Sequence, residues 1–118
     1  MQVPHARWAA LLCALAFSAA FGHGTVESTS PRSGATLTTP PAEIRLQFNE
    51  AMEPAFTTIK LFDPSGQEVP TKEKARLENG KTAVLALPVL APGSYRAEWK
   101  TVGHDGHRVH GTLGFTLK

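Results

Sequence analysis

Cysteine is almost absent from this chain of 118 residues: the single example is Cys13, close to the N-terminus. Beyond that position the chain can form neither a disulfide nor a thiolate metal ligand. The length is sufficient for one domain and not for two. A domain of this size buries somewhat over about 60% of its unfolded surface, so its core can be stable without disulfides.

The first 22 residues have the pattern of a cleaved signal peptide. Residues 1–8 include one Arg and one His, residues 9–20 are an unbroken run of apolar and small side chains, and residues 20–22 have a small residue at each end. Secretory signals show a charged start, an apolar centre and a small-residue cleavage site in this order. The run is shorter than the roughly 20 residues that a membrane-spanning helix needs. We therefore expect residues 1–22 to be removed and residues 23–118 to form one exported domain.

An excess of charge of one sign is also missing from the exported part. Cleavage would remove Arg7 and leave eleven Lys and Arg against ten Asp and Glu, with the two signs mixed along the chain. Binding to nucleic acid or to a membrane surface normally relies on a basic excess. The overall charge therefore predicts neither of these as a partner.

Long helices are absent from the pattern after residue 22, and short alternating runs take their place. Apolar residues recur at every second position, for example in residues 44–48, 95–99 and 109–117. This period of two indicates β-strands, and Gly, Pro and Asn between the runs are typical of turns. Asn79 followed by Gly80 favours a hairpin with a polar edge strand before it. About seven short strands at this spacing predict an all-β sandwich.

Histidine is the residue type that points to chemistry. Four histidines remain after cleavage, namely His23, which becomes the first residue, and His104, His107 and His110 near the C-terminus. An N-terminal His offers its α-amine and its ring nitrogen to one metal ion, which closes a chelate ring. Nitrogen and oxygen donors in a tetragonal plane suit Cu(II), the most tightly bound of the first-row divalent ions.

Asp105 and His107, separated by one glycine, supply the carboxylate and the second imidazole that would complete this plane. Residues two apart on an extended segment point to the same side, which places this pair at the rim of the core-facing side. His104 and His110 have the opposite parity and are expected to be exposed polar residues. The sequence thus predicts a Cu(II) site formed by His23, Asp105 and His107.

Three segments of the exported part resemble a known family. Residues 23–31 begin with His23 and reach a Ser-Pro turn, residues 44–50 are an alternating run that ends in Phe-Asn-Glu, and residues 99–107 contain the Asp-Gly-His sequence. In these features the chain resembles the copper resistance protein CopC and its relatives. The resemblance covers essentially all of residues 23–118.

The resemblance implies an Ig-like Greek-key β-sandwich in the bacterial periplasm that binds copper without catalysing a reaction. It assigns the Cu(II) ligands to His23, Asp105 and His107, and it matches Glu50 with an acidic residue near that site. Glu50 also ends the inward row that begins at Ile44, which fits a supporting contact to the amine or to a ligand. A CopD-type membrane copper transporter is implied as a partner in copper homeostasis or resistance, and we expect a monomer.

Methionine content separates this chain from some members of the family, which have a methionine-rich loop that binds Cu(I). Met52 is the only methionine after residue 22, and one thioether cannot form such a site. We therefore expect a protein that binds Cu(II) only, with Met52 as an exposed or half-packed loop residue.

Two other functions remain open at this point. A copper-dependent oxidative enzyme resembling a lytic polysaccharide monooxygenase would use the same N-terminal histidine on a sandwich. Such enzymes are usually larger and present a flat aromatic face, whereas Tyr95, Trp99 and Phe115 are expected in the core here. A metal-free Ig-like module that binds another protein would take up no copper and would tolerate a changed N-terminus.

Overall fold

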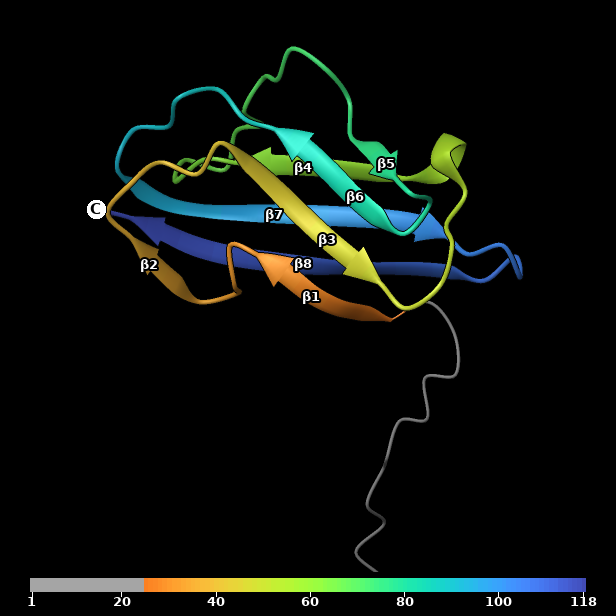
Figure 1. The fold of residues 1–118 in the computed structure, drawn as a ribbon. Coiled ribbons are helices and arrows are strands. Elements are labelled where there is room, and N and C mark those ends of the chain that lie inside the picture. The colour runs from red at the N-terminus through yellow and green to blue at the C-terminus, as the bar shows by residue number, and fades with distance from the viewer. Residues whose placement is uncertain (1–24) are drawn as a thin grey trace, which may run out of the picture.

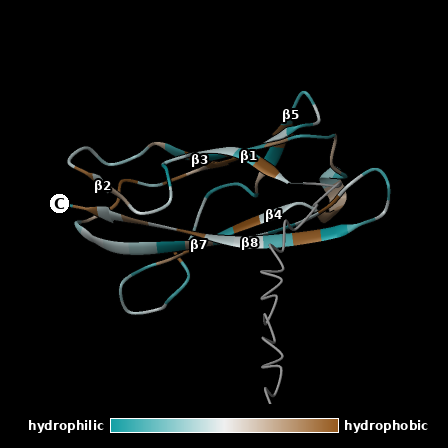
Figure 2. Ribbon diagram, turned by 90° about the horizontal axis from the view of Figure 1, so that it is seen from below, coloured by the Kyte–Doolittle hydropathy of each residue, from teal (hydrophilic) through white to brown (hydrophobic). Residues whose placement is uncertain are grey.

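The computed structural model of the chain describes residues 25–118, which form two β-sheets that pack face to face. The strands of the first sheet are, in spatial order, β1 (Val26–Ser30), β3 (Glu43–Phe48), β6 (Thr82–Ala86) and β5 (Arg76–Glu78). Those of the second sheet are β2 (Ala35–Leu37), β8 (Arg108–Leu117), β7 (Gly93–Val102) and β4 (Thr58–Phe62). Figure 1 shows the first sheet in front, and Figure 2 shows the two layers from the side.

The connections make this a Greek-key sandwich, because most of them cross from one sheet to the other and only β5–β6 and β7–β8 join neighbours in one sheet. The predicted Ig-like β-sandwich is therefore confirmed. The predicted boundary at residue 22 lies outside the described residues. Within residues 25–118, no helix has the length and apolar character needed to cross a membrane.

One strand, β2, was not among the predicted strands. It pairs in parallel with the end of β8, with Ala35 opposite Phe115 and Leu37 opposite Leu117. Its three residues are too few to show an alternating pattern, so the pairing depends on the backbone of β8. The predicted polar edge strand before Asn79 and Gly80 is confirmed as β5, which turns into β6 through positive φ angles at these two residues.

The core lies between the sheets and is formed by the alternating rows that the sequence predicts. Ile44, Leu46 and Phe48 of β3 are almost completely buried, as are most inward residues of β4, β7 and β8. Tyr95 also packs here, and its hydroxyl donates a hydrogen bond of 2.6 Å to the carbonyl oxygen of Ala91. A tyrosine tied back to the backbone a few residues upstream is typical of Ig-like sandwiches.

Met52 corrects an expectation, because it is fully buried in the core instead of lying in an exposed loop. Its backbone N–H donates to the carbonyl oxygen of Gly80 at 2.8 Å, and the residue also forms a β-bridge with Gly103. The segment after β3 therefore crosses the end of the sandwich and turns its methionine inward. Met52 has the same parity as the buried row of β3, but Asn49 and Glu50 interrupt the apolar run at the end of that strand, so the pattern did not predict this burial.

Gly111 has no side chain, which leaves space for the indole ring of the residue opposite it. It lies opposite Trp99, whose ring packs edge-on against Phe48 with centroids 5.4 Å apart. A Cβ atom at position 111 would come within 2.5 Å of Trp99 Cζ2. The indole ring therefore has to move if this glycine gains a side chain.

We expect Gly111→Ala to destabilise the domain by about 1–3 kcal/mol, the usual cost of overpacking. For a domain of this size that is a fall in Tm of roughly 5–20 °C, measurable by circular dichroism. Gly114→Ala on the same strand is the control, because its nearest contact, the Tyr95 carbonyl oxygen, lies at an ordinary 3.7 Å. Equal shifts in the two variants would show that the indole packing is not the cause.

Candidate metal centre

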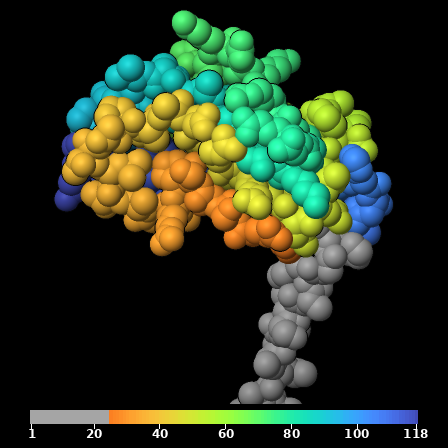
Figure 3. All heavy atoms as spheres, in the orientation of Figure 1, coloured from red at the N-terminus to blue at the C-terminus, as the bar shows by residue number. Residues whose placement is uncertain are grey.

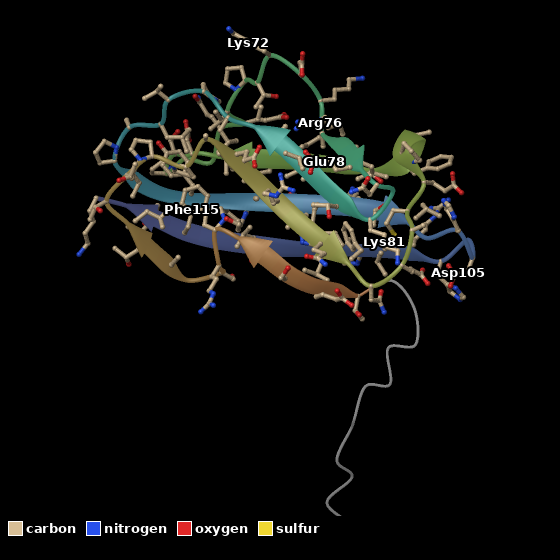
Figure 4. The ribbon with its side chains drawn as sticks, viewed as in Figure 1. Lys72, Arg76, Glu78, Lys81, Asp105 and Phe115 are labelled. Atoms are coloured by element: carbon tan, nitrogen blue, oxygen red, sulfur yellow. The ribbon has the colours of Figure 1, made fainter. Side chains whose placement is uncertain are left out.

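One end of the sandwich brings together most of the predicted site. Two segments form it: residues 49–53, which follow β3, and residues 103–107, which connect β7 to β8. We call this end the hairpin pole, and Asp105 marks it in Figure 4. The pole is bound together by backbone hydrogen bonds, since the His104 N–H donates to the Ala51 carbonyl oxygen and the Glu53 N–H to that of Val102.

The β7–β8 loop has a closed backbone that holds its side chains in place. The Gly103 N–H donates to the His107 carbonyl oxygen at 2.9 Å, and the Gly106 N–H donates to the Gly103 carbonyl oxygen at 2.9 Å. Gly106 has a φ of 86°, a conformation that glycine adopts without strain. The Asp105 carboxylate accepts a third bond, from the His107 N–H at 3.0 Å. The spacing of one glycine thus folds the two candidate ligands back onto each other.

The structure brings the side chains of Asp105 and His107 into direct contact. His107 Nδ1 lies 2.9 Å from Asp105 Oδ2. The imidazole is largely exposed and the carboxylate is half-buried, with side-chain exposures of 64% and 29%. A ring nitrogen and a carboxylate oxygen at this separation can face one ion from neighbouring positions.

Glu50 reaches the same place from the other segment of the pole. Its Oε1 atom is buried and has no hydrogen-bond partner among residues 25–118. A Cβ atom added to Gly103 would overlap this Oε1 and would lie 2.8 Å from Asp105 Oδ1. Two carboxylates therefore converge over one glycine, an arrangement that favours a positive charge beside them. Sequence reasoning did not single out Gly103, because its importance comes only from this close approach.

His104 and His110 do not join the pair, and both are exposed, as predicted. His104 turns toward Glu53, with Nε2 3.6 Å from Glu53 Oε1. His110 lies farther along β8, opposite Lys100 on the outer side of the second sheet. The three C-terminal histidines thus have three different environments and do not form one cluster.

His23 lies outside the described residues, but the chain enters the domain beside the pole. The Thr25 N–H donates to Asn49 Oδ1 at 2.9 Å, and the Asn49 N–H donates to the Thr25 carbonyl oxygen at 3.0 Å. Asn49 precedes Glu50, so the first described residue is attached next to the converging carboxylates. Within residues 25–118 no group of three or more His, Asp or Glu side chains is arranged to hold a metal ion.

Comparison with known proteins agrees with this architecture. A family model described as the CopC domain matches residues 26–118. The copper transport protein CutJ of Bacillus subtilis is 33% identical over 93% of this chain, which spans only about a fifth (21%) of that protein's length. The copper resistance protein C of Xanthomonas campestris pv. juglandis is 32% identical, over 88% of this chain and 87% of that protein. The crystal structure of CopC from Methylosinus trichosporium OB3b superposes with a TM-score of 0.75 at 30% identity, covering 81% of this chain and 94% of that one.

Proposed function

Since the chain belongs to the CopC domain family, we propose that it is an exported copper-binding protein that holds one Cu(II) ion at the hairpin pole. His23 contributes its α-amine and imidazole, His107 a second imidazole and Asp105 a carboxylate oxygen. Glu50 supports the site from beside the amine. The observation that carries the proposal is the convergence of the Glu50 and Asp105 carboxylates over Gly103, next to the point where the chain enters the domain.

The reach of the N-terminal segment supports this ligand set. Thr25 is attached to Asn49 by two hydrogen bonds, and two residues of extended chain span at most about 7 Å. The proposed amine ligand therefore has to lie within about 7 Å of Thr25, which is attached next to Glu50. A protonated amine or a bound metal ion would supply the positive charge that the two carboxylates favour.

The donor set fits Cu(II) better than Cu(I). Three nitrogens and one carboxylate oxygen are ligands that Cu(II) accepts in a tetragonal plane, whereas Cu(I) selects soft sulfur ligands. The one sulfur atom of the described residues, that of Met52, is buried in the core. We expect this chain to bind copper in its oxidised state.

The cellular role that we propose follows from export and from the family. Residues 1–22 act as a signal peptide, and residues 23–118 work as a monomer in the periplasm. The relatives named for copper transport and copper resistance support a part in copper homeostasis. Buffering of Cu(II), or its delivery to a CopD-type membrane transporter, is the activity that a single exposed site can provide.

The experiment that tests this proposal is a Cu(II) titration of residues 23–118 followed by electron paramagnetic resonance. We expect one equivalent of Cu(II) per chain and a spectrum typical of a tetragonal site with nitrogen and oxygen ligands. An intense blue absorption typical of thiolate ligands, or two equal sites per chain, would contradict the model.

Glu50 provides a second test, because it faces the site without occupying the predicted ligand plane. We expect Glu50→Gln to weaken Cu(II) binding by about 10–100-fold, the usual effect of a residue that supports metal ligands. Glu53→Gln is the matched control, since that carboxylate is on the same segment but lies 3.6 Å from His104 Nε2. Equal losses of affinity in the two variants would show that only the overall charge of the pole matters.

A further inference from the structure

The outer surface of the second sheet gathers basic side chains from three strands. In the register of this sheet Lys60 lies opposite Glu98, and Lys100 lies opposite both Thr58 and His110. Directly opposed residues of paired strands point to the same side of a sheet. The intervening residues face the core, so this surface is the outward row of β4, β7 and β8.

We call this surface the basic face and define it by its charged residues: Lys60, Arg96, Glu98, Lys100 and Arg108. All four basic side chains are exposed. The acid of these strands, Glu98, is paired with Arg96, 3.0 Å away, and lies opposite Lys60. The three strands thus carry four positive charges and one negative charge on this face, and Glu68, which bridges to Phe62, adds one acid at the β4 edge. The face therefore has a positive excess, although the exported part of the chain is nearly neutral.

The outer surface of the first sheet does not share this excess. There Arg45 pairs with Glu78 at 2.7 Å and with Glu43 at 3.0 Å, and Arg76 pairs with Glu78 at 3.1 Å. The hydrogen bond from Arg45 lowers the pKa of the Glu78 carboxyl, which keeps this acid ionised beside its partners. The two broad sides of the sandwich therefore differ in charge, one balanced and one basic.

The basic face lacks the apolar anchor that protein partners usually occupy. The exposed large apolar residues of the described chain, Phe56 and Val89, lie in connections and not on its strands. Phe62 is half-buried, and the guanidinium of Arg96 lies over its ring at 5.5 Å. Protein interfaces depend on buried aromatic anchors, whereas an anionic bilayer attracts long basic side chains without such an anchor.

We propose that the basic face docks reversibly on a lipid bilayer with anionic headgroups. This inference rests on the proposed export, which brings the domain to a membrane surface. The hairpin pole lies at the end of β7 and β8, so docking on the outer side of these strands leaves Asp105 at the margin of the contact (Figure 4). Copper bound there stays accessible to a protein within the same membrane. The near-neutral net charge of the exported part led to the prediction that it does not bind a membrane surface. Net charge, however, does not show how the charges are distributed over the surface.

The test measures co-sedimentation of residues 23–118 with vesicles at low ionic strength. We expect binding to vesicles of equal parts phosphatidylcholine and phosphatidylglycerol, none to phosphatidylcholine alone, and release at high salt because screening weakens exposed charges. Neutralising three residues of the basic face should lower the partition coefficient about a hundredfold, since each basic side chain near an anionic surface contributes about fivefold. The three changes are Lys60→Gln, Arg96→Gln and Lys100→Gln.

A control variant with the same net charge distinguishes an effect of the basic face on vesicle binding from an effect of the overall charge. It carries Arg32→Gln, Lys72→Gln and Arg76→Gln, three exposed residues that are not on the strands of the basic face. Lys72 is on the β4–β5 connection that projects from the edge of the sandwich (Figures 3 and 4), and Arg76 has an ion pair like that of Arg96. We expect this variant to keep its vesicle binding.

Three results would overturn the inference: equal binding to both kinds of vesicle, an equal loss of binding in the two variants, or no binding to either vesicle. The last of these would leave an acidic protein as the alternative partner. A Cu(II) titration of the same samples keeps the two proposals distinct. Copper binding without vesicle binding overturns only the docking inference. Vesicle binding without copper binding overturns only the proposed metal site.

Discussion

Adding one glycine ahead of His23 is expected to weaken Cu(II) binding by at least about a hundredfold, more than changes around metal ligands usually cost. The reason is covalent, because the extension converts the free α-amine into an amide nitrogen. An amide nitrogen is not basic and binds a metal ion only after it loses its proton. The added residue also places atoms where the chelate ring of His23 would close.

The comparison uses residues 23–118, the version with one added glycine and His23→Ala, each titrated with Cu(II). Circular dichroism and the Tm of the metal-free proteins should be nearly the same, since chain ends contribute little burial. If the extended protein binds copper as tightly as the cleaved one, the amine is not a ligand. The site would then have to be rebuilt from the three C-terminal histidines.

His107→Ala is expected to cause a loss of Cu(II) affinity of similar size, at least about a hundredfold, because it removes the third nitrogen of the plane. The contact between His107 Nδ1 and Asp105 Oδ2 places this imidazole beside the carboxylate that completes the site. His104→Ala and His110→Ala should change the affinity only a few-fold, since His104 turns toward Glu53 and His110 lies opposite Lys100.

His104 is a closely matched control for this prediction. Its side chain is 61% exposed, against 64% for His107, and both lie in the β7–β8 loop. The two substitutions should therefore have equal and small effects on the Tm of the metal-free protein. If all three alanine variants lose copper affinity to the same extent, the site is a loose cluster of histidines and the proposed geometry is wrong.

The sequence pattern alone predicted those features of this protein that depend on residues close together in the chain. The period of two placed Ile44, Leu46 and Phe48 in the core, since successive side chains of a strand point to opposite faces. The same rule predicted that Asp105 and His107 share one side of an extended segment, but the two residues lie in the turn before β8. The turn, with Gly106 at a φ of 86°, is what brings their side chains into contact. The resemblance to CopC, carried by short motifs, led to the family and the fold.

Tertiary structure decided every feature that joins distant segments. Met52 is buried because residues 49–53 cross the end of the sandwich. The Glu50 and Asp105 carboxylates converge over Gly103 because that residue has no side chain. The basic face brings Lys60 of β4 beside Lys100 of β7, whose charges are dispersed among acids in the sequence. Such contacts depend on strand register and on the packing of the two sheets. Neither the local alternation of residues nor the net charge of the chain determines register or packing.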